Sequence, residues 1–466
     1  MVNSCVLPIS ILCFLVLTTG GSAYRHEAGQ QQQAQCRIQS INPLEPARRL
    51  QHEAGYTDVW DQTFDQIQCA GVAASRHLIQ QGGLLLPTFS NAPLLAYVVK
   101  GRGIVGTINP GCAETFQSSE QIDVGGQFGS QKFRDQHQKI HRCRKGDIVA
   151  FKVGVAHWVH NDGNEDLELM VVHDTSNVEN QLDQNLRRFF LAGNPQESEM
   201  QQRRKYSGQQ QDDENFSGNL FQGFETEVLA ESFQVDMETA ARLQGQDDNR
   251  GFIVRVGKEF EMQRPSKYEE EERRREWSPK SNRFEETVCT MRIRENLDDP
   301  ERADVYTAQG GRISTVNSHN LPILKEIQLS AERGVLYENA MAAPHWTLNA
   351  HNIIYILRGT GRIQVVGHSN RAVFNGEVRQ GQLLVVPQNY AEVKLAGNEG
   401  LEWVSFKTND RAISSPLAGK TSVIRAMPVE VVMSAFRMSR DEAQKLKYNR
   451  QEVRIFPRSK RQSERI

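Results

Sequence analysis

Two stretches of the chain carry short runs of apolar and β-branched residues that end at glycine-rich turns. Residues 94–111 read LLAYVVKGRGIVGTINPG, and residues 352–367 read NIIYILRGTGRIQVVG. Runs of this kind, bounded by glycine, predict β-strands that are joined as hairpins. In each case a second glycine turn follows and leads into another apolar run, at 143–159 and at 378–395. The pattern therefore predicts a β-domain that is present twice in the chain.

A helical pattern follows each predicted β-domain. Residues 227–244 and 430–447 align without a gap at a constant offset of 203, and both carry apolar residues at helical spacing. Asp236 and Ser439 are predicted N-caps of a second helix, and Ser439 with Glu442 fits a capping box. Each repeat is therefore a β-barrel followed by a short helical arm, and the predicted fold class is mainly β.

Polar, low-complexity stretches separate these predicted ordered parts. They cover residues 27–35, 117–139, 195–218 and 267–282. Because they contain few apolar side chains, burial cannot offset the entropy lost on ordering. We expect them to form mobile surface loops.

The first residues have the features of a secretory signal. An apolar run ends in small residues, which predicts a signal peptide over 1–23 and cleavage between Ala23 and Tyr24. A buried helix is the alternative interpretation. Removal of the signal takes two of the seven cysteines with it. Five cysteines remain, so at least one is a free thiol or pairs with another chain: Cys36, Cys69, Cys112, Cys143 and Cys289.

The charge of the chain is nearly balanced overall but is divided unevenly along it. The net charge is -2, which argues against a strongly basic nucleic-acid binder. Residues 24–282 hold 29 basic and 37 acidic side chains, whereas residues 283–466 hold 26 basic and 20 acidic ones. The chain also has 40 Gln, 26 Asn and 39 Arg but only 16 Lys. No fold requires this excess of nitrogen-rich side chains, so it needs a functional explanation.

The duplicated, glycine-punctuated barrels resemble the cupin superfamily, which implies two jelly-roll β-barrels. Cupins that bind a metal place two His and a Glu on one strand pair and a further His on the next, a ligand set suited to a first-row transition metal. In the first barrel the corresponding stretch contains Phe89, Ser90 and Asn91 and none of those ligands. His157 keeps the last ligand position, but one imidazole cannot hold a metal site. We expect His157 to be a hydrogen-bonded core or interface histidine.

In the second barrel the ligand set is also incomplete. His345 keeps the first position, and Thr347, Asn352 and Glu392 fill the other three. His345 and Glu392 would supply two ligands, and Thr and Asn are poor replacements for the rest. We therefore expect no catalytic residue, no cofactor and no metal site in either barrel.

The stretch SNRFEETVCTMRIREN (281–296) closely resembles the processing junction of the legumin-type (11S) seed storage globulins. The resemblance covers nearly the whole mature chain, including GGLLLPTFSNAP and GVAHWVHNDG in its first half. In that family an asparaginyl endopeptidase cuts after an Asn, which is Asn282 here. Arg283 follows it, where the family usually has Gly. The resemblance implies an acidic chain over 24–282, with its barrel at about 36–250, and a basic chain over 283–466 with the second barrel and arm.

The resemblance also implies how the pieces stay together and what they do. It pairs Cys36 with Cys69 and Cys112 with Cys289 across the cut, and leaves Cys143 unpaired. It implies a nutrient reservoir that forms a homo- or hetero-trimer and then a hexamer of related globulin chains in the protein storage vacuoles of seeds. Nucleic acid and membranes are not expected partners of the mature protein. The alternatives are a metal-dependent bicupin oxidase or isomerase and a small-ligand-binding cupin.

Overall fold

The computed structural model describes residues 36, 38–112, 114, 116–123, 132–195, 218–257, 260, 289, 291–369 and 371–458. The predicted signal cleavage between Ala23 and Tyr24 and the predicted cut between Asn282 and Arg283 lie outside these residues. Both remain predictions.

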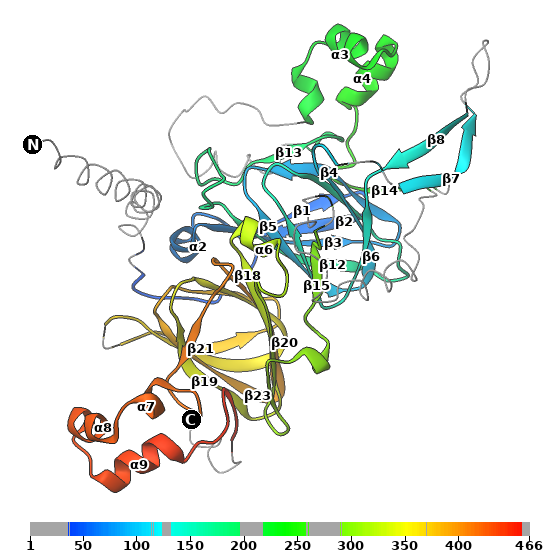
Figure 1. Cartoon of the computed structure of the whole chain (residues 1–466). Coiled ribbons are helices and arrows are strands. Elements are labelled where there is room, and N and C mark those ends of the chain that lie inside the picture. The colour runs from blue at the N-terminus through cyan, green and yellow to red at the C-terminus, as the bar shows by residue number, and fades with distance from the viewer. Residues whose placement is uncertain are drawn as a thin grey trace, which may run out of the picture.

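The first barrel is built from two antiparallel sheets whose strands are not adjacent in sequence order (Figure 1). One sheet contains β1 (Arg48–His52), β2 (Gly55–Val59), β3 (Val72–Ile79), β12 (Leu167–Asp174), β5 (Leu94–Lys100), β10 (Asp147–Phe151) and β15 (Arg294–Asn296). The other contains β13 (Arg188–Phe190), β4 (Gly83–Ser90), β11 (Ala156–His160), β6 (Arg102–Ile108) and β9 (Ile140–Arg144), and β14 (Ile253–Arg255) pairs with β4.

The second barrel is formed by a single ten-stranded antiparallel sheet dominated by two long strands, β20 (Asn352–Val366) and β23 (Ala391–Lys407). Its other strands are β16 (Val305–Thr307), β17 (Gly311–Val316), β18 (Ser330–Leu336), β19 (Ala340–Thr347), β21 (Ala372–Arg379), β22 (Leu383–Val386), β24 (Ser414–Pro416) and β25 (Ile455–Pro457). The two barrels confirm the predicted mainly β class and the duplicated jelly-roll architecture.

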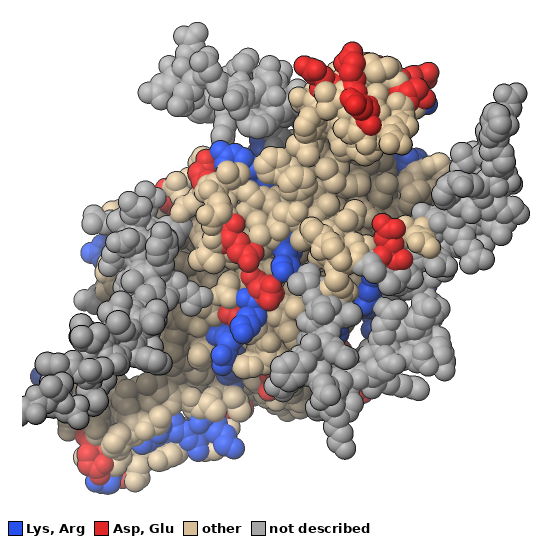
Figure 2. All heavy atoms as spheres, turned by 45° about the horizontal axis from the view of Figure 1, so that its top comes forward, with Lys and Arg blue, Asp and Glu red and all other residues tan. Residues whose placement is uncertain are grey.

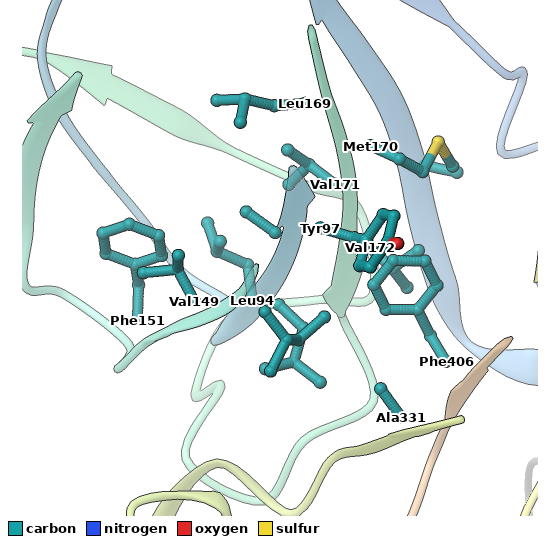
Figure 3. Packing of buried hydrophobic residues seen from close by; sticks show 14 of the residues in the cluster. Leu94, Tyr97, Val149, Phe151, Leu169, Met170, Val171, Val172, Ala331 and Phe406 are labelled. Carbon is teal, nitrogen blue, oxygen red and sulfur yellow. The ribbon is translucent and has the colours of Figure 1, made fainter. Parts of the chain in front are cut away.

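Three strands of the seven-stranded sheet, β5, β10 and β12, are buried on both faces, which explains why they read as continuous apolar runs. On β12, Leu169 and Val171 point into the first barrel, whereas Met170 and Val172 point to the other side (Figure 3). Phe406 of the second barrel packs on that outer side (Figure 3). Because side chains alternate along a strand, one strand supplies both the barrel interior and the contact between barrels. One hydrophobic cluster therefore extends from the first barrel across the contact with the second, and a separate cluster lies within the second barrel.

The helical arms project from opposite ends of the molecule (Figure 1). The first contains η2 (Leu220–Gly223), α3 (Thr226–Phe233) and α4 (Met237–Gln244), and the second contains α7 (Val423–Ala426), α8 (Val429–Phe436) and α9 (Arg440–Tyr448). Asp236 caps α4, and Ser439 forms the predicted capping box with Glu442. Short helices α2 (Asp65–Ala70), α6 (Leu324–Ile327) and η3 (Pro300–Arg302) lie elsewhere. Of the helices that the structure describes, none is long and apolar enough to span a membrane.

Part of one predicted loop is ordered, which corrects the expectation for residues 117–139. Strands β7 (Phe116–Asp123) and β8 (Lys132–His137) pair with each other as a separate two-stranded sheet that projects from the first barrel (Figure 1). Hairpin pairing satisfies backbone hydrogen bonds locally, so it does not depend on the apolar content that guided the prediction.

The two sides of the predicted cut are interlocked. Strand β15 follows the cut in sequence, yet it pairs with β10 of the first barrel, with Asp147 opposite Asn296. In return, Leu44 from the N-terminal side exchanges backbone hydrogen bonds of 2.7 and 2.9 Å with Leu383 of the second barrel. Tyr97 and Arg333 join the two barrels through a hydrogen bond of 3.2 Å from Arg333 Nε to the phenol oxygen. Each piece therefore completes the fold of the other.

Candidate functional site

The second barrel brings His345 and Glu392 together, as the ligand positions of a cupin would require. Strands β19 and β23 pair in a register that sets these two residues opposite each other. His345 Nε2 lies 3.4 Å from Glu392 Oε1, and both side chains are buried. His345 Nδ1 donates a hydrogen bond of 2.9 Å to the carbonyl of Ala343, which fixes the orientation of the ring. His345 and Glu392 are thus neighbours.

Lys394, which no pattern in the sequence indicated, lies beside them. It lies two residues after Glu392 on β23, so both side chains point to the same face of the strand. Lys394 Nζ donates a hydrogen bond of 2.7 Å to Glu392 Oε2, and its side chain is fully buried. Asn352 Nδ2 donates a bond of 2.7 Å to the other oxygen, Oε1. Both oxygens of Glu392 are therefore already engaged by protein donors.

A second buried ion pair stands close to the first. Lys407 Nζ donates to Glu332 Oε2 at 3.2 Å, and Arg454 Nη2 lies 3.5 Å from the same oxygen. Burial by itself would raise the pKa of Glu332, but the positive charges of Lys407 and Arg454 outweigh it and hold that pKa well below its usual range. Burial alone would also raise the pKa of Glu392, but Lys394 and His345 outweigh it and hold that pKa well below its usual range. Two carboxylates and two lysine ammonium groups thus compensate one another inside the barrel.

These residues do not fit a metal ion. A transition-metal site needs several converging imidazole, carboxylate or thiolate donors. Here Thr347 and Asn352 replace two of them, and the ammonium of Lys394 already neutralises the carboxylate that remains. A metal cation would have to displace that ammonium from a buried position. Among the described residues, no three His, Cys, Asp or Glu side chains are grouped so that they could hold a metal ion.

The corresponding residues of the first barrel have structural contacts. Phe89 stacks on Phe189 with ring centroids 4.9 Å apart. Ser90 Oγ donates a hydrogen bond of 2.6 Å to the carbonyl of Ala92, and Asn91 Nδ2 donates to a loop carbonyl at 3.0 Å. None of these groups is a substitute for a histidine or glutamate ligand.

His157 lies inside the first barrel as a hydrogen-bonded core residue, as its isolation in the sequence suggested. Its Nδ1 donates a hydrogen bond of 3.2 Å to the carbonyl of Val155, and its ring packs 4.4 Å from that of Phe151. Burial lowers the pKa of His157 to about 4, so the imidazole is neutral near pH 7. His77, His173 and Arg188 lie around the same interior space, although nothing in their spacing along the chain indicated it.

Two disulfides link the cysteine pairs that the family resemblance implies. Cys36 is bonded to Cys69, and Cys112 is bonded to Cys289 across 177 residues of sequence. Cys143 is a buried free thiol, and burial raises its pKa to about 12. A thiol that remains protonated and is shielded from solvent is chemically inert.

Comparison with known proteins agrees with this architecture. Residues 41–197 and 295–444 both match the Cupin family model, so the protein is a duplicated cupin. It is 50% identical to the 11S globulin seed storage protein Ana o 2.0101 of Anacardium occidentale, with 95% of this chain and 97% of the relative covered. It is 48% identical to 11S globulin seed storage protein 1 of Carya illinoinensis, with 97% of each chain covered. The chain belongs to the 11S seed storage globulins of the cupin family.

Solved structures show the same relationship. The recombinant pro-11S globulin of pumpkin superposes with a TM-score of 0.80 at 46% sequence identity, and the match covers 91% of this chain and 100% of that one. The coconut allergen cocosin superposes with a TM-score of 0.78 at 47% identity over 91% of this chain and 100% of that one.

Proposed function

We propose that this protein is a nutrient reservoir of seeds and not an enzyme. The observation that carries the proposal is the Lys394–Glu392 ion pair, at 2.7 Å, where a catalytic cupin would hold its metal. A buried ion pair of this kind makes the barrel interior self-contained, because each charge is compensated within the chain. The relatives named as seed storage proteins support the same conclusion.

The amino-acid composition supports storage of nitrogen. The 40 Gln, 26 Asn and 39 Arg residues carry side-chain nitrogen that the fold does not need. In a reservoir this nitrogen is itself the useful content. The compact, interlocked barrels protect the bulk of the chain until proteases digest it.

We propose that an asparaginyl endopeptidase cuts the chain after Asn282 and that Arg283 begins the basic chain. The Cys112–Cys289 disulfide supports this maturation, because it joins residues on the two sides of the cut. The pairing of β15 with β10 supports it as well, because backbone hydrogen bonds hold the two pieces together independently of the disulfide.

We further propose that the arms assemble the protein into a trimer, which then pairs into a hexamer. Apolar side chains remain exposed on both arms of the single chain; Phe233 is 52% exposed and Phe436 is 49% exposed. Residues 225–244 carry five acidic side chains and one basic one, whereas residues 429–448 carry three acidic and four basic ones. Figure 2 shows acidic groups gathered on the upper arm. An acidic arm on one protomer and a more basic arm on the next favour head-to-tail contacts, which close into a ring.

The predicted signal over 1–23 supports entry into the secretory pathway, and protein storage vacuoles of seeds are the proposed destination. Two measurements on native protein purified from seeds test the proposal. Denaturing electrophoresis should give one band near 50 kDa without reductant and two smaller bands with it, since the full chain is 52.8 kDa. Elemental analysis should find far less than one transition metal per chain. A single reduced band, or a stoichiometric metal that is lost in His345→Ala, would overturn it.

A further inference from the structure

A chain of hydrogen bonds links the two sheets of the first barrel. Arg188 Nη2 on β13 donates to Ser75 Oγ on β3 at 3.2 Å, and Ser75 Oγ lies 3.5 Å from His77 Nε2. On the other side of the ring, His77 Nδ1 lies 2.9 Å from Thr57 Oγ1 on β2. The same hydroxyl oxygen lies 3.1 Å from Nε2 of His52, at the end of β1. These five residues are called the histidine chain below.

The histidine chain has a direction, because an arginine side chain can donate hydrogen bonds but cannot accept them. Ser75 Oγ therefore accepts from Arg188 and gives its own proton to His77 Nε2. The other ring nitrogen, Nδ1, then carries the proton that His77 donates to Thr57, whose hydroxyl donates to His52 Nε2. This assignment satisfies every link with two neutral imidazoles, and it does not depend on what else Arg188 contacts.

A proton added to either ring breaks this order. An imidazolium has two N–H donors and no acceptor, so the hydroxyl that donated to the ring loses its acceptor. That hydroxyl is Ser75 for His77 and Thr57 for His52, and both hydroxyl side chains are buried. Burial lowers the pKa of His52 to about 4 and keeps that of His77 well below its usual value, with Arg188 acting in the same direction. The chain therefore holds only while both rings are neutral.

The other titratable groups nearby do not compensate a new positive charge. His157 and His173 face the same interior, and burial lowers the pKa of both. Asp174 follows His173 along β12, so its side chain points to the other face of that strand. Glu53 follows His52 at an exposed position. Among the described residues, no carboxylate acts on the pKa of His52 or of His77.

The histidine chain supports the segment 250–255, which contains β14. The ring centroid of Phe252 lies 3.9 Å from that of His52 and 6.2 Å from that of His77. Gly251 approaches His52 so closely that a Cβ added there would lie 2.5 Å from Nδ1 of the ring. An imidazolium that turned toward solvent would therefore withdraw the surface on which Phe252 packs.

We propose that the histidine chain is an acid-sensitive latch, which holds the β1–β2 hairpin and the segment 250–255 on the first barrel near neutral pH and releases them when acid protonates His52 and His77. Release exposes the rings to water, where the ordinary pKa of 6.5 lets them bind protons that the closed barrel excludes. Acid between pH 6.5 and about pH 4 therefore favours the open form. The latch is a property of the fold and holds whether or not the protein stores nutrients. In a reservoir, it would give proteases access to the first barrel in acid.

Hydrogen–deuterium exchange of the full, assembled protein at about pH 7 and about pH 4.5, corrected for the effect of pH on intrinsic exchange, tests the proposal. If opening restores the ordinary pKa of His52, that residue alone shifts the opening equilibrium by about fiftyfold between these pH values. We expect protection of residues 48–59 and 250–255 to fall by about tenfold or more in acid, and β20 of the second barrel to keep its protection. Equal protection of 250–255 at both pH values, or an equal loss in β20, would refute the latch.

The double variant His52→Gln with His77→Gln removes both protonation sites and keeps side chains that can donate and accept hydrogen bonds. Its protection of residues 250–255 should change by less than about threefold between the two pH values. The matched control is His319→Gln, at an exposed position outside the first barrel, which should behave like wild type. A double variant that opens in acid as readily as wild type would reject the assignment of the latch to these two rings.

A measurement on the wild-type protein decides the question if the double variant does not fold. Exchange of the imidazole C2 hydrogen, followed by mass spectrometry, reports the protonation of each histidine separately. We expect His52 and His77 to remain neutral at about pH 5.5 in the protein whose segment 250–255 is still protected. Rings that are protonated while this segment stays protected would overturn the proposal, because the closed barrel would then tolerate the charge.

Discussion

The ammonium of Lys394 and the carboxylate of Glu392 form an ion pair of 2.7 Å inside the second barrel, on residues two apart along one strand. Their position beside His345 is where a metal-binding cupin would place its cation. An ammonium supplied by the chain itself therefore performs the charge compensation that a metal ion would otherwise perform.

Lys394→Met should strongly destabilise the protein. Methionine keeps most of the side-chain volume but leaves Glu392 as a buried, uncompensated charge, which costs about 3–5 kcal/mol in comparable cases. The free energy of unfolding can be measured by guanidinium denaturation. The double variant Glu392→Gln with Lys394→Met should lose less unfolding free energy than Lys394→Met alone, because it leaves no uncompensated carboxylate at position 392. Lys420→Met, at an exposed position, is the control. If Lys394→Met unfolds at the same guanidinium concentration as wild type, the pair is not needed for stability.

Because Asp174 is buried, its carboxyl group should make the stability of the protein fall as the pH rises. Burial raises its pKa from 3.8 to about 7, despite hydrogen bonds from Asn177 and Ser176 that act in the opposite direction. The folded protein thus keeps a proton that the unfolded chain releases, so stability falls between pH 3.8 and about 7 and then levels off. Between about pH 5 and about pH 8, the free energy of unfolding of Asp174→Asn should fall by roughly 3 kcal/mol less than that of wild type.

Guanidinium denaturation at several pH values measures this difference. Glu179→Gln removes an exposed carboxyl from the segment that follows β12 and serves as the control. The prediction would be wrong if Asp174→Asn and wild type showed the same slope of stability against pH.

Cys289→Ser should free the acidic chain from the basic chain only when the protein is denatured. The disulfide with Cys112 is a covalent link, but the β15–β10 pairing and the backbone bonds between Leu44 and Leu383 also hold the pieces together. After cleavage, the variant should give two bands in denaturing gels without reductant and still sediment like wild type under native conditions. Cys143→Ser is the control, because Cys143 forms no disulfide. Loss of native assembly in Cys289→Ser alone would show that the noncovalent contacts are insufficient.

Asn282→Gln should block maturation and stop assembly at the trimer. The clustered charges of residues 267–282 would be costly to desolvate in an interface between two trimers, and cleavage lets the new ends move away. Expressed in a seed, the variant should remain one chain in reducing denaturing gels. Sedimentation should find trimers. Arg283→Gly, which restores the residue usual in the family, should be cut at least as well as wild type. Cleavage of Asn282→Gln at the same bond would disprove the assigned site.

Joint replacement of Phe233 and Phe436 by alanine should prevent trimer formation. Both rings are about half exposed in the single chain, and truncation of a ring that is fully buried in an interface costs on the order of 3 kcal/mol. Sedimentation velocity should show a shift toward monomer. Tyr306→Ala removes another exposed ring, 64% exposed and outside the arms, and should leave the trimer intact. A double variant that still sediments as a trimer would exclude the arms as the assembly contact.

Local patterns in the sequence were enough to predict the repeated unit. Glycine turns between apolar runs identified both barrels, and the residues of a capping box identified the start of α9, because strand formation and helix capping depend on neighbours within a few positions. The same local reasoning failed for residues 117–139, where strands β7 and β8 pair without an apolar signal.

The tertiary structure decided what each barrel interior contains. The sequence showed that Thr347 and Asn352 are unsuitable ligands, but it did not indicate that Lys394 would form a buried ion pair with Glu392. It also did not indicate that Arg188 would meet His77 and His173 around one cavity. Lys394 and Glu392 lie on one strand, whereas Arg188 lies on β13 of one sheet and His77 and His173 lie on the paired strands β3 and β12 of the other. Their contacts depend on strand register and on which face each side chain occupies, and both are determined only when the barrel closes.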